Sequence, residues 1–174
     1  MIKKSESVLQ KLQKELGIKN IFALPKIVKV VINVGLGRSV KDEKFLALVL
    51  RDLALISGQK PRTTSAKKSI ANFKTRQGMV IGAMVTLRGQ RMNDFINRLI
   101  HTALPRTRDF RGLSDTSLDP KGNLTIGIKE HIVFPEVSGE EMKNIFGFEV
   151  TVVVKAKNKE EALVLYKTLG FPIK

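Results

Sequence analysis

Residues 26–34 read KIVKVVINV, and this stretch decides the fold class. Apolar residues recur along it with a period of two, which is typical of a β-strand with one buried face. One set of side chains is predicted to point inward and the other outward: Val28, Val30, Ile32 and Val34 inward, and Ile27, Lys29, Val31 and Asn33 outward. The outward face is therefore expected to be mixed, with a lysine and an asparagine on it.

Three further stretches repeat this design, with apolar residues on one side and Thr, Arg, Lys or Gly on the other. They are residues 80–88, 124–129 and 148–155. Parallel sheets are covered on both faces and seldom show such alternation, whereas antiparallel sheets with one solvated face do. We therefore predict an α+β fold, a two-layer sandwich in a single domain of residues 1–174. Its sheet is expected to be mainly antiparallel, with helices on one face and the other face open.

Four helices with one apolar stripe each are predicted between the strands. They run from Ser5 to Leu16, from a capping box at Ser39 and Asp42 to about Ile56, from Gly89 to Pro105, and from the Asn158 cap to Gly170. Residues 132–134 look strand-like. Residues 106–122 lack periodicity and are predicted to form a long exposed connection.

The stretch from Gly58 to Asn93 carries eight basic residues and no acid. A cation run of this length either stays solvated or meets a polyanion, and the absence of every acid favours the polyanion. The residues between the charges are mostly small, polar or glycine, which lets backbone amides and hydroxyls reach phosphates and riboses. This stretch is therefore predicted to bind nucleic acid.

The charge of the whole chain supports the same class of partner. The 174 residues carry a net charge of +15 with an isoelectric point near 10.2. Residues 1–59 contribute +6, residues 60–111 contribute +10 and residues 112–174 contribute −1. The C-terminal third is therefore expected to do something other than hold phosphates.

Several classes of site are disfavoured. There is no cysteine, and His101 and His131 lack partners at metal-ligand spacing, so no metal site is expected. The Gly35-Leu36-Gly37 turn resembles the start of a dinucleotide-binding loop, but Val40 stands where its third glycine belongs. We expect no cofactor and no small-molecule substrate. The N-terminus is unlike a signal peptide and no stretch could span a membrane, which favours the cytoplasm.

Two other functions compete with RNA binding. An enzyme would need a catalytic set of nucleophile, base or paired carboxylates, and none can be assembled from this sequence. A DNA-binding regulator would need a base-reading helix, whereas the predicted helices use their apolar faces for packing and the charge lies on strands and loops. The near absence of Tyr and Trp also argues against base stacking on the sheet, and favours a folded RNA held by its backbone and minor groove.

Seven collinear motifs carry a family resemblance over nearly the whole chain. They are INVGLG at 32–37, ISGQKP at 56–61, AKKSIANFKTRQG at 66–78, VTLRGQRM at 85–92, LPRTRDFRGL at 104–113, GN at 122–123 and HIVFPE at 131–136. The chain thereby resembles the bacterial-type large-subunit ribosomal protein five family, which binds 5S rRNA. It departs from the family pattern at Val80, where proline is usual, and at Leu118, where phenylalanine is frequent.

The resemblance implies a structural role in the central protuberance of the large subunit, with three contact regions. The 5S rRNA surface is expected at Lys29, Asn33, Gln59 and Thr86, together with Lys60, Arg62 and Arg88 of the basic stretch. A loop at 73–79 is expected to contact peptidyl-site tRNA through Lys74, Thr75, Arg76, Gln77, Gly78 and Met79. A bridge to the small-subunit head and its protein thirteen is expected at Arg108, Asp109, Phe110, Arg111, Gly112 and Leu113, beside residues 134–144. Large-subunit rRNA and other 5S rRNA-binding ribosomal proteins complete the expected partners.

Overall fold

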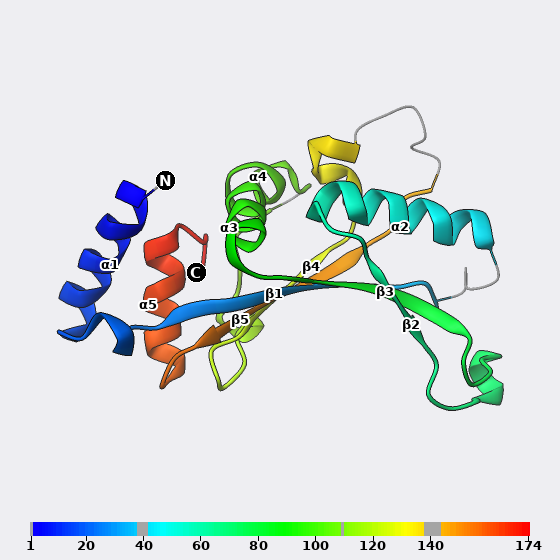
Figure 1. Ribbon diagram of the computed structural model, residues 1–174, viewed down its shortest axis with the longest axis horizontal. Coiled ribbons are helices and arrows are strands. Elements are labelled where there is room, and N and C mark those ends of the chain that lie inside the picture. Colours follow the sequence, from blue (N-terminus) through cyan, green and yellow to red (C-terminus); the bar gives the residue numbers. More distant parts are fainter. Residues whose placement is uncertain (1, 38–41, 109, 138–143) are drawn as a thin grey trace.

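A five-stranded antiparallel sheet forms the centre of the computed structural model, which describes residues 2–37, 42–108, 110–137 and 144–174. The strands are β1 (Lys26–Gly35), β2 (Arg62–Ser65), β3 (Val80–Leu87), β4 (Leu124–Ile128) and β5 (Phe148–Lys155). Their order in the sheet is β2-β3-β1-β5-β4, so the strand predicted from residues 26–34 lies in the middle (Figure 1). The predicted α+β class with an antiparallel sheet is confirmed.

One face of the sheet is buried and the other is accessible to solvent. Along β1, Val30, Ile32 and Val34 are buried, whereas Asn33 between them is exposed. The prediction fails only at the start of the strand, where Ile27 is half-buried against the core and Val28 is exposed. A register shift between residues 27 and 29 explains this, because the extra residue of a β-bulge reverses the alternation.

The longer helices are α1 (Ile2–Leu16), α2 (Glu43–Ser57), α3 (Gly89–Arg98) and α5 (Lys159–Leu169). Asp42 caps α2 by accepting from the main-chain N–H groups of Lys44 and Phe45, and Gly58 ends it in a left-handed conformation. The predicted capping box, with Ser39 as the cap and Asp42 in the first turn, was wrong because Asp42 is itself the cap. Ser39 lies outside the described residues. Asn158 stands at the N-terminus of α5 as predicted, but its side chain makes no capping bond. Figure 1 shows α2 and α3 on the same side of the strands; that every helix lies on this side stays a prediction.

The third predicted helix continues past Arg98 through a π-helical segment, η4 (Leu99–Ala103), into the short α4 (Leu104–Arg106). Pro105 lies in α4, and inside a regular helix its ring would clash with the carbonyl of residue 101. The wider π turn supplies the room that the proline needs. The helix therefore ends at Arg106 rather than at Pro105, one residue later than expected.

Some of the described connections between these elements contain short 3-10 turns. They are η1 (Ile21–Ala23), η3 (Ala71–Phe73), η5 (Asp115–Ser117), η6 (His131–Val133) and η7 (Pro135–Val137). The prediction of a strand-like segment at residues 132–134 was therefore wrong. The described residues of 106–122 are also less exposed than predicted, because Leu113 and Leu118 are buried in the core.

The C-terminal helix α5 is fastened to the sheet by a buried tyrosine. The Tyr166 hydroxyl lies 3.0 Å from the main-chain oxygen of Gly122 and 3.2 Å from that of Val152 in β5. Helix α1 packs against α5 on its other side, with Leu12 buried (Figure 1). Within the described ranges, no helix combines the length and the hydropathy needed to cross a membrane.

Candidate nucleic-acid interface

The accessible face of the sheet carries the polar residues that the sequence predicted for it. Asn33 in β1 stands opposite Met84 of β3, and Arg62 of β2 pairs with the same Met84 on its far side. Because paired residues share a face, these three side chains form one row across three strands. Asn33 and Arg62 are exposed, and the Asn33 side chain makes no hydrogen bond within the described part of the chain. Its amide is therefore available to a partner.

A second row lies one pleat along the strands. Thr86 of β3 pairs with Val31 of β1, and Lys29 stands two residues before Val31 on the same face. Lys29 and Thr86 are half-buried rather than sealed beneath other elements. Arg88, directly after β3, is exposed. The expectation that Lys29, Asn33 and Thr86 face outward is confirmed.

Gln59 is brought to this surface by the turn that follows α2. Its Nε2 donates to the main-chain oxygen of Thr86 at 3.3 Å, which links two residues that lie far apart in the sequence. The Ser57 hydroxyl fixes the turn, lying 2.6 Å from Leu53 O and 2.9 Å from Gln59 O, and it accepts from the Gln59 N–H. Gln59 is therefore positioned before any ligand arrives.

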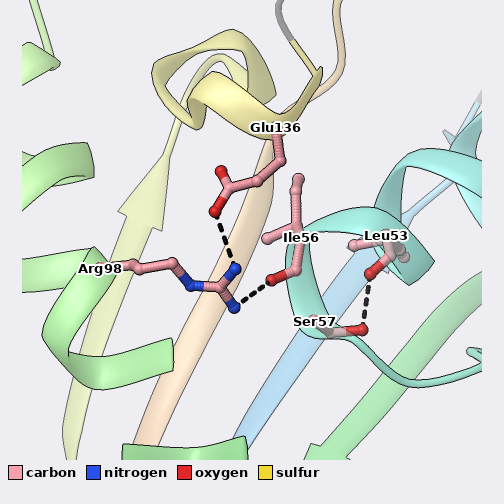
Figure 2. A network of polar contacts seen from close by, with 5 residues as sticks. All are labelled: Leu53, Ile56, Ser57, Arg98 and Glu136. Atoms are coloured by element: carbon pink, nitrogen blue, oxygen red, sulfur yellow. Dashed lines mark hydrogen bonds and ion pairs between the residues drawn. The ribbon is translucent and has the colours of Figure 1, made fainter. Parts of the chain in front are cut away.

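Arg98 of α3 contacts the C-terminal end of α2 (Figure 2). Arg98 Nη2 donates to the main-chain oxygen of Ile56 at 2.9 Å, and Nη1 contacts Glu136 of η7 at 2.8 Å. A cation at the last carbonyls of a helix also interacts favourably with its dipole. This network braces the Ser57–Gln59 turn against α3.

The predicted loop at 73–79 forms the end of an ordered hairpin between β2 and β3. Main-chain bonds in both directions join Ile70 to Thr75, and the Ser69 hydroxyl accepts from the Gln77 N–H at 2.9 Å. Lys74 holds a left-handed conformation with φ of 51°. Phe73 beside it is 74% exposed. The hairpin projects beyond the rest of the sheet (Figure 1), so its cations lie apart from the Asn33 row.

The segment 108–113 ends at Leu113, which the last residues of the chain hold through main-chain hydrogen bonds. Leu113 donates its N–H to Pro172 O and accepts from the Lys174 N–H, at 2.8 and 2.9 Å. Leu113 is buried, so its side chain serves the core. Arg108 and Arg111 are exposed, and Asp109 lies outside the described residues.

The sequence did not indicate that Glu149 belongs to the accessible face beside Asn33. Glu149 is exposed, and it pairs with Asn33 on one side and Gly127 of β4 on the other. The alternation of β5 put Glu149 on the face opposite to Phe148, but only the strand order reveals that β5 is a neighbour of β1. An acid here repels phosphates and can accept from amino or hydroxyl groups, so this part of the face suits riboses or base edges better.

Titratable groups elsewhere have structural roles. His131 Nε2 lies 3.4 Å from Asp52 of α2, and its Nδ1 accepts from the Phe146 N–H at 3.3 Å, with both partners of the pair buried. Burial lowers the pKa of His131, against the opposing influence of the Asp52 carboxylate. Across the described residues, no group of three or more His, Cys, Asp or Glu side chains could hold a metal ion.

Comparison with known proteins assigns both halves of the chain. Residues 20–76 match the family model of ribosomal protein L5, and residues 80–173 match the model of the C-terminal region of the same ribosomal family. The chain is 51% identical to large ribosomal subunit protein uL5 of Dichelobacter nodosus, over 97% of this chain and 94% of that protein. It is 49% identical to uL5 of Halothermothrix orenii, over 96% and 93% of the two chains. It is also 50% identical to uL5 of Prochlorococcus marinus, over 97% and 94%.

Proposed function

The chain belongs to the ribosomal protein L5 family, and we propose that it holds 5S rRNA on the accessible face of its sheet, in the central protuberance of the large ribosomal subunit. As a member of this family it is a structural ribosomal protein rather than an enzyme, and it works on the ribosomes of the cytoplasm. We also propose that it is a single domain, since both matched segments contribute strands to one sheet.

One observation carries the 5S rRNA proposal. The sheet buries one face and leaves Lys29, Asn33 and Thr86 accessible, beside a stretch of eight cations without an acid. The accessible positions of the strands carry no aromatic side chain that could stack bases. Such a face suits a folded RNA, whose shallow minor groove displays riboses and base edges while nearby cations meet its phosphates. Contacts with large-subunit rRNA and with other 5S rRNA-binding ribosomal proteins follow from the same location.

The hairpin end at 73–79 is proposed to contact peptidyl-site tRNA. Lys74 and Arg76 are exposed cations on a loop that its own main-chain bonds keep in shape. Phe73 adds an exposed aromatic ring, which bases of an RNA could stack on. The distance between this hairpin end and the Asn33 row favours two separate RNA contacts.

The segment 108–113 is proposed to bridge to the small-subunit head through its protein thirteen. Arg108 and Arg111 are exposed, and main-chain hydrogen bonds from the C-terminal residues hold the end of the segment at Leu113. Residues 112–174, which continue from this segment, carry a net charge of −1 and fit a protein partner better than a phosphate backbone.

A gel-shift titration with purified 5S rRNA tests the first proposal. Asn33→Ala should weaken binding by about 1–3 kcal/mol, because it removes hydrogen bonds that become buried against RNA. The same change at Asn97, an exposed residue of α3, is the matched control and should leave binding unchanged. Since the Asn33 side chain makes no internal hydrogen bond within the described ranges, protein stability should change by less than about 0.5 kcal/mol. Equal affinity and equal salt dependence for duplex DNA of the same length would refute specific recognition.

The tRNA proposal is tested by Lys74→Ala, with Lys167→Ala on α5 as its control. Lys74→Ala should leave 5S rRNA affinity nearly unchanged and should reduce crosslinking of peptidyl-site tRNA to ribosomes assembled with the variant. If Lys74→Ala abolishes 5S rRNA binding while Asn33→Ala does nothing, the two surfaces are assigned in reverse.

A further inference from the structure

A hollow of about 570 Å³ lies between the outer side of α2 and the link to β2. Its apolar floor is made by Leu50 and Ala54 of α2 and by Pro61 of the link. The volume falls within the range of pockets that take small ligands. Leu50 and Ala54 are half-buried, so apolar surface remains accessible at this point on a strongly charged protein.

The rim of the hollow is cationic and polar. Arg51 and Lys60 line it, together with Gln59, and none of the lining residues is an acid. Asp52 lies next in the chain, but it is buried and paired with Arg51 and His131. Gln59 uses Nε2 for its bond to the sheet, while its Oε1 accepts no hydrogen bond within the described part of the chain. The hollow therefore offers an apolar floor, positive charge beside it and a hydrogen-bond acceptor.

We propose that this hollow receives one unpaired nucleobase of the bound 5S rRNA, a step that rests on the RNA binding proposed above. A nucleotide combines a flat apolar body with phosphates on either side, which matches an apolar floor next to Lys60 and Arg51. Unpaired bases turned out of an RNA are read by stacking and by hydrogen bonds to their edges, and Gln59 Oε1 accepts from a base amino group. Gln59 also belongs to the sheet-face surface, so the hollow continues that surface around the end of α2.

The test fills the hollow without removing a charge. Ala54→Met occupies its floor, and Ala47→Met places the same side chain seven residues earlier on the same side of α2, outside the hollow. Purified wild type and both variants are titrated with 5S rRNA, and the flexibility of each nucleotide is mapped by chemical probing of the 2′-hydroxyls. We expect Ala54→Met to weaken binding about tenfold, the effect of losing one buried base with its hydrogen bond to Gln59, and to restore the reactivity of one unpaired nucleotide. Ala47→Met should match the wild type in both measurements.

A second arm works on the RNA, so that the result does not depend on how Ala54→Met folds. The protected nucleotide is replaced by an abasic residue in synthetic 5S rRNA, which should weaken wild-type binding by the same factor. Ala54→Met should then cause no further loss, because base and hollow form one interaction. Lys60→Gln should reduce the slope of log affinity against log salt by about one.

The outcomes separate the two proposals. If wild type binds 5S rRNA tightly but no unpaired nucleotide is protected, or if the abasic RNA binds as well as the normal RNA, the nucleobase inference is overturned and RNA binding by the sheet stands. The nucleobase inference is also overturned if Ala54→Met leaves both measurements unchanged and instead weakens association with another protein. If wild type shows no preference for 5S rRNA over duplex DNA, the proposed function itself fails.

Discussion

Replacing Arg98 by methionine is expected to lower the free energy of unfolding by about 1–1.5 kcal/mol. The bond from Nη2 to Ile56 O joins a charged donor to a carbonyl at the end of α2 and contributes about 1.5–2 kcal/mol. The ion pair with Glu136 adds about 0.5 kcal/mol, since its side chains are 36% and 26% exposed and solvent weakens it. These two contributions are partly offset by Arg98 Nε, which is buried without a partner in the described structure and lowers stability by about 1 kcal/mol. Methionine keeps an unbranched aliphatic side chain at the site, so little packing is lost.

Urea unfolding followed by circular dichroism measures this change, with Glu136→Gln as the control. Glu136→Gln removes the ion pair alone and should cost about 0.5 kcal/mol. Because Arg98 braces the turn that carries Gln59, Arg98→Met should also weaken 5S rRNA binding severalfold under conditions where the variant is fully folded. The control variant, Glu136→Gln, should bind 5S rRNA as the wild type does. Equal losses of stability in both variants would show that the ion pair, and not the bond to Ile56, holds the end of α2.

Two further predictions concern stability away from the proposed RNA surface. Tyr166→Phe should lower the free energy of unfolding by about 1–2 kcal/mol, because two buried main-chain oxygens lose their hydroxyl partner. The control, Thr168→Val on the same helix, should lower it far less. Equal urea midpoints for the two variants would contradict this prediction. The pKa of His131 is lower in the folded chain than its ordinary 6.5, so the unfolded chain takes up the proton first as the pH falls. Stability should therefore be complete above about pH 6.5 and decline below it, and His131→Asn should flatten that part of a plot of unfolding free energy against pH.

The side of the sheet that meets solvent could be predicted from residues 26–34 because alternation is a local property of a strand. Lys29 and Asn33 fall on the accessible face for that reason alone, and the order of the strands does not matter. The end of α2 was similarly predictable, since Gly58 supplies the left-handed residue with which helices commonly end. Gln59 could therefore be placed just past the helix from the sequence.

The features that could not be predicted from the sequence depend on contacts between distant segments of the chain. Glu149 lies beside Asn33 only because β5 adds to β1, which no local pattern specifies. Leu113 was expected in an exposed connection, but the C-terminal residues pair with its main chain and its side chain is part of the buried core. The bulge at Val28 is likewise a property of the pairing with β5. Such features change which side chains a partner can reach without leaving a mark on composition or periodicity.

The basic stretch from Gly58 to Asn93 combines positive charge with a backbone held in a defined conformation. Cations on a solvated loop attract any polyanion, and contacts to phosphates alone carry no sequence information. In this chain Arg62 is fixed by the pairing of β2 with β3, and Lys74 by the bonds within the hairpin end. Gln59 is fixed between Ser57 and Thr86 at the same edge of the surface. A rigid RNA that matches these fixed spacings makes several contacts without ordering the protein first, whereas an arbitrary polyanion gains only the unspecific attraction. Under the proposed function, these fixed spacings add selection by shape to the attraction of a net positive charge.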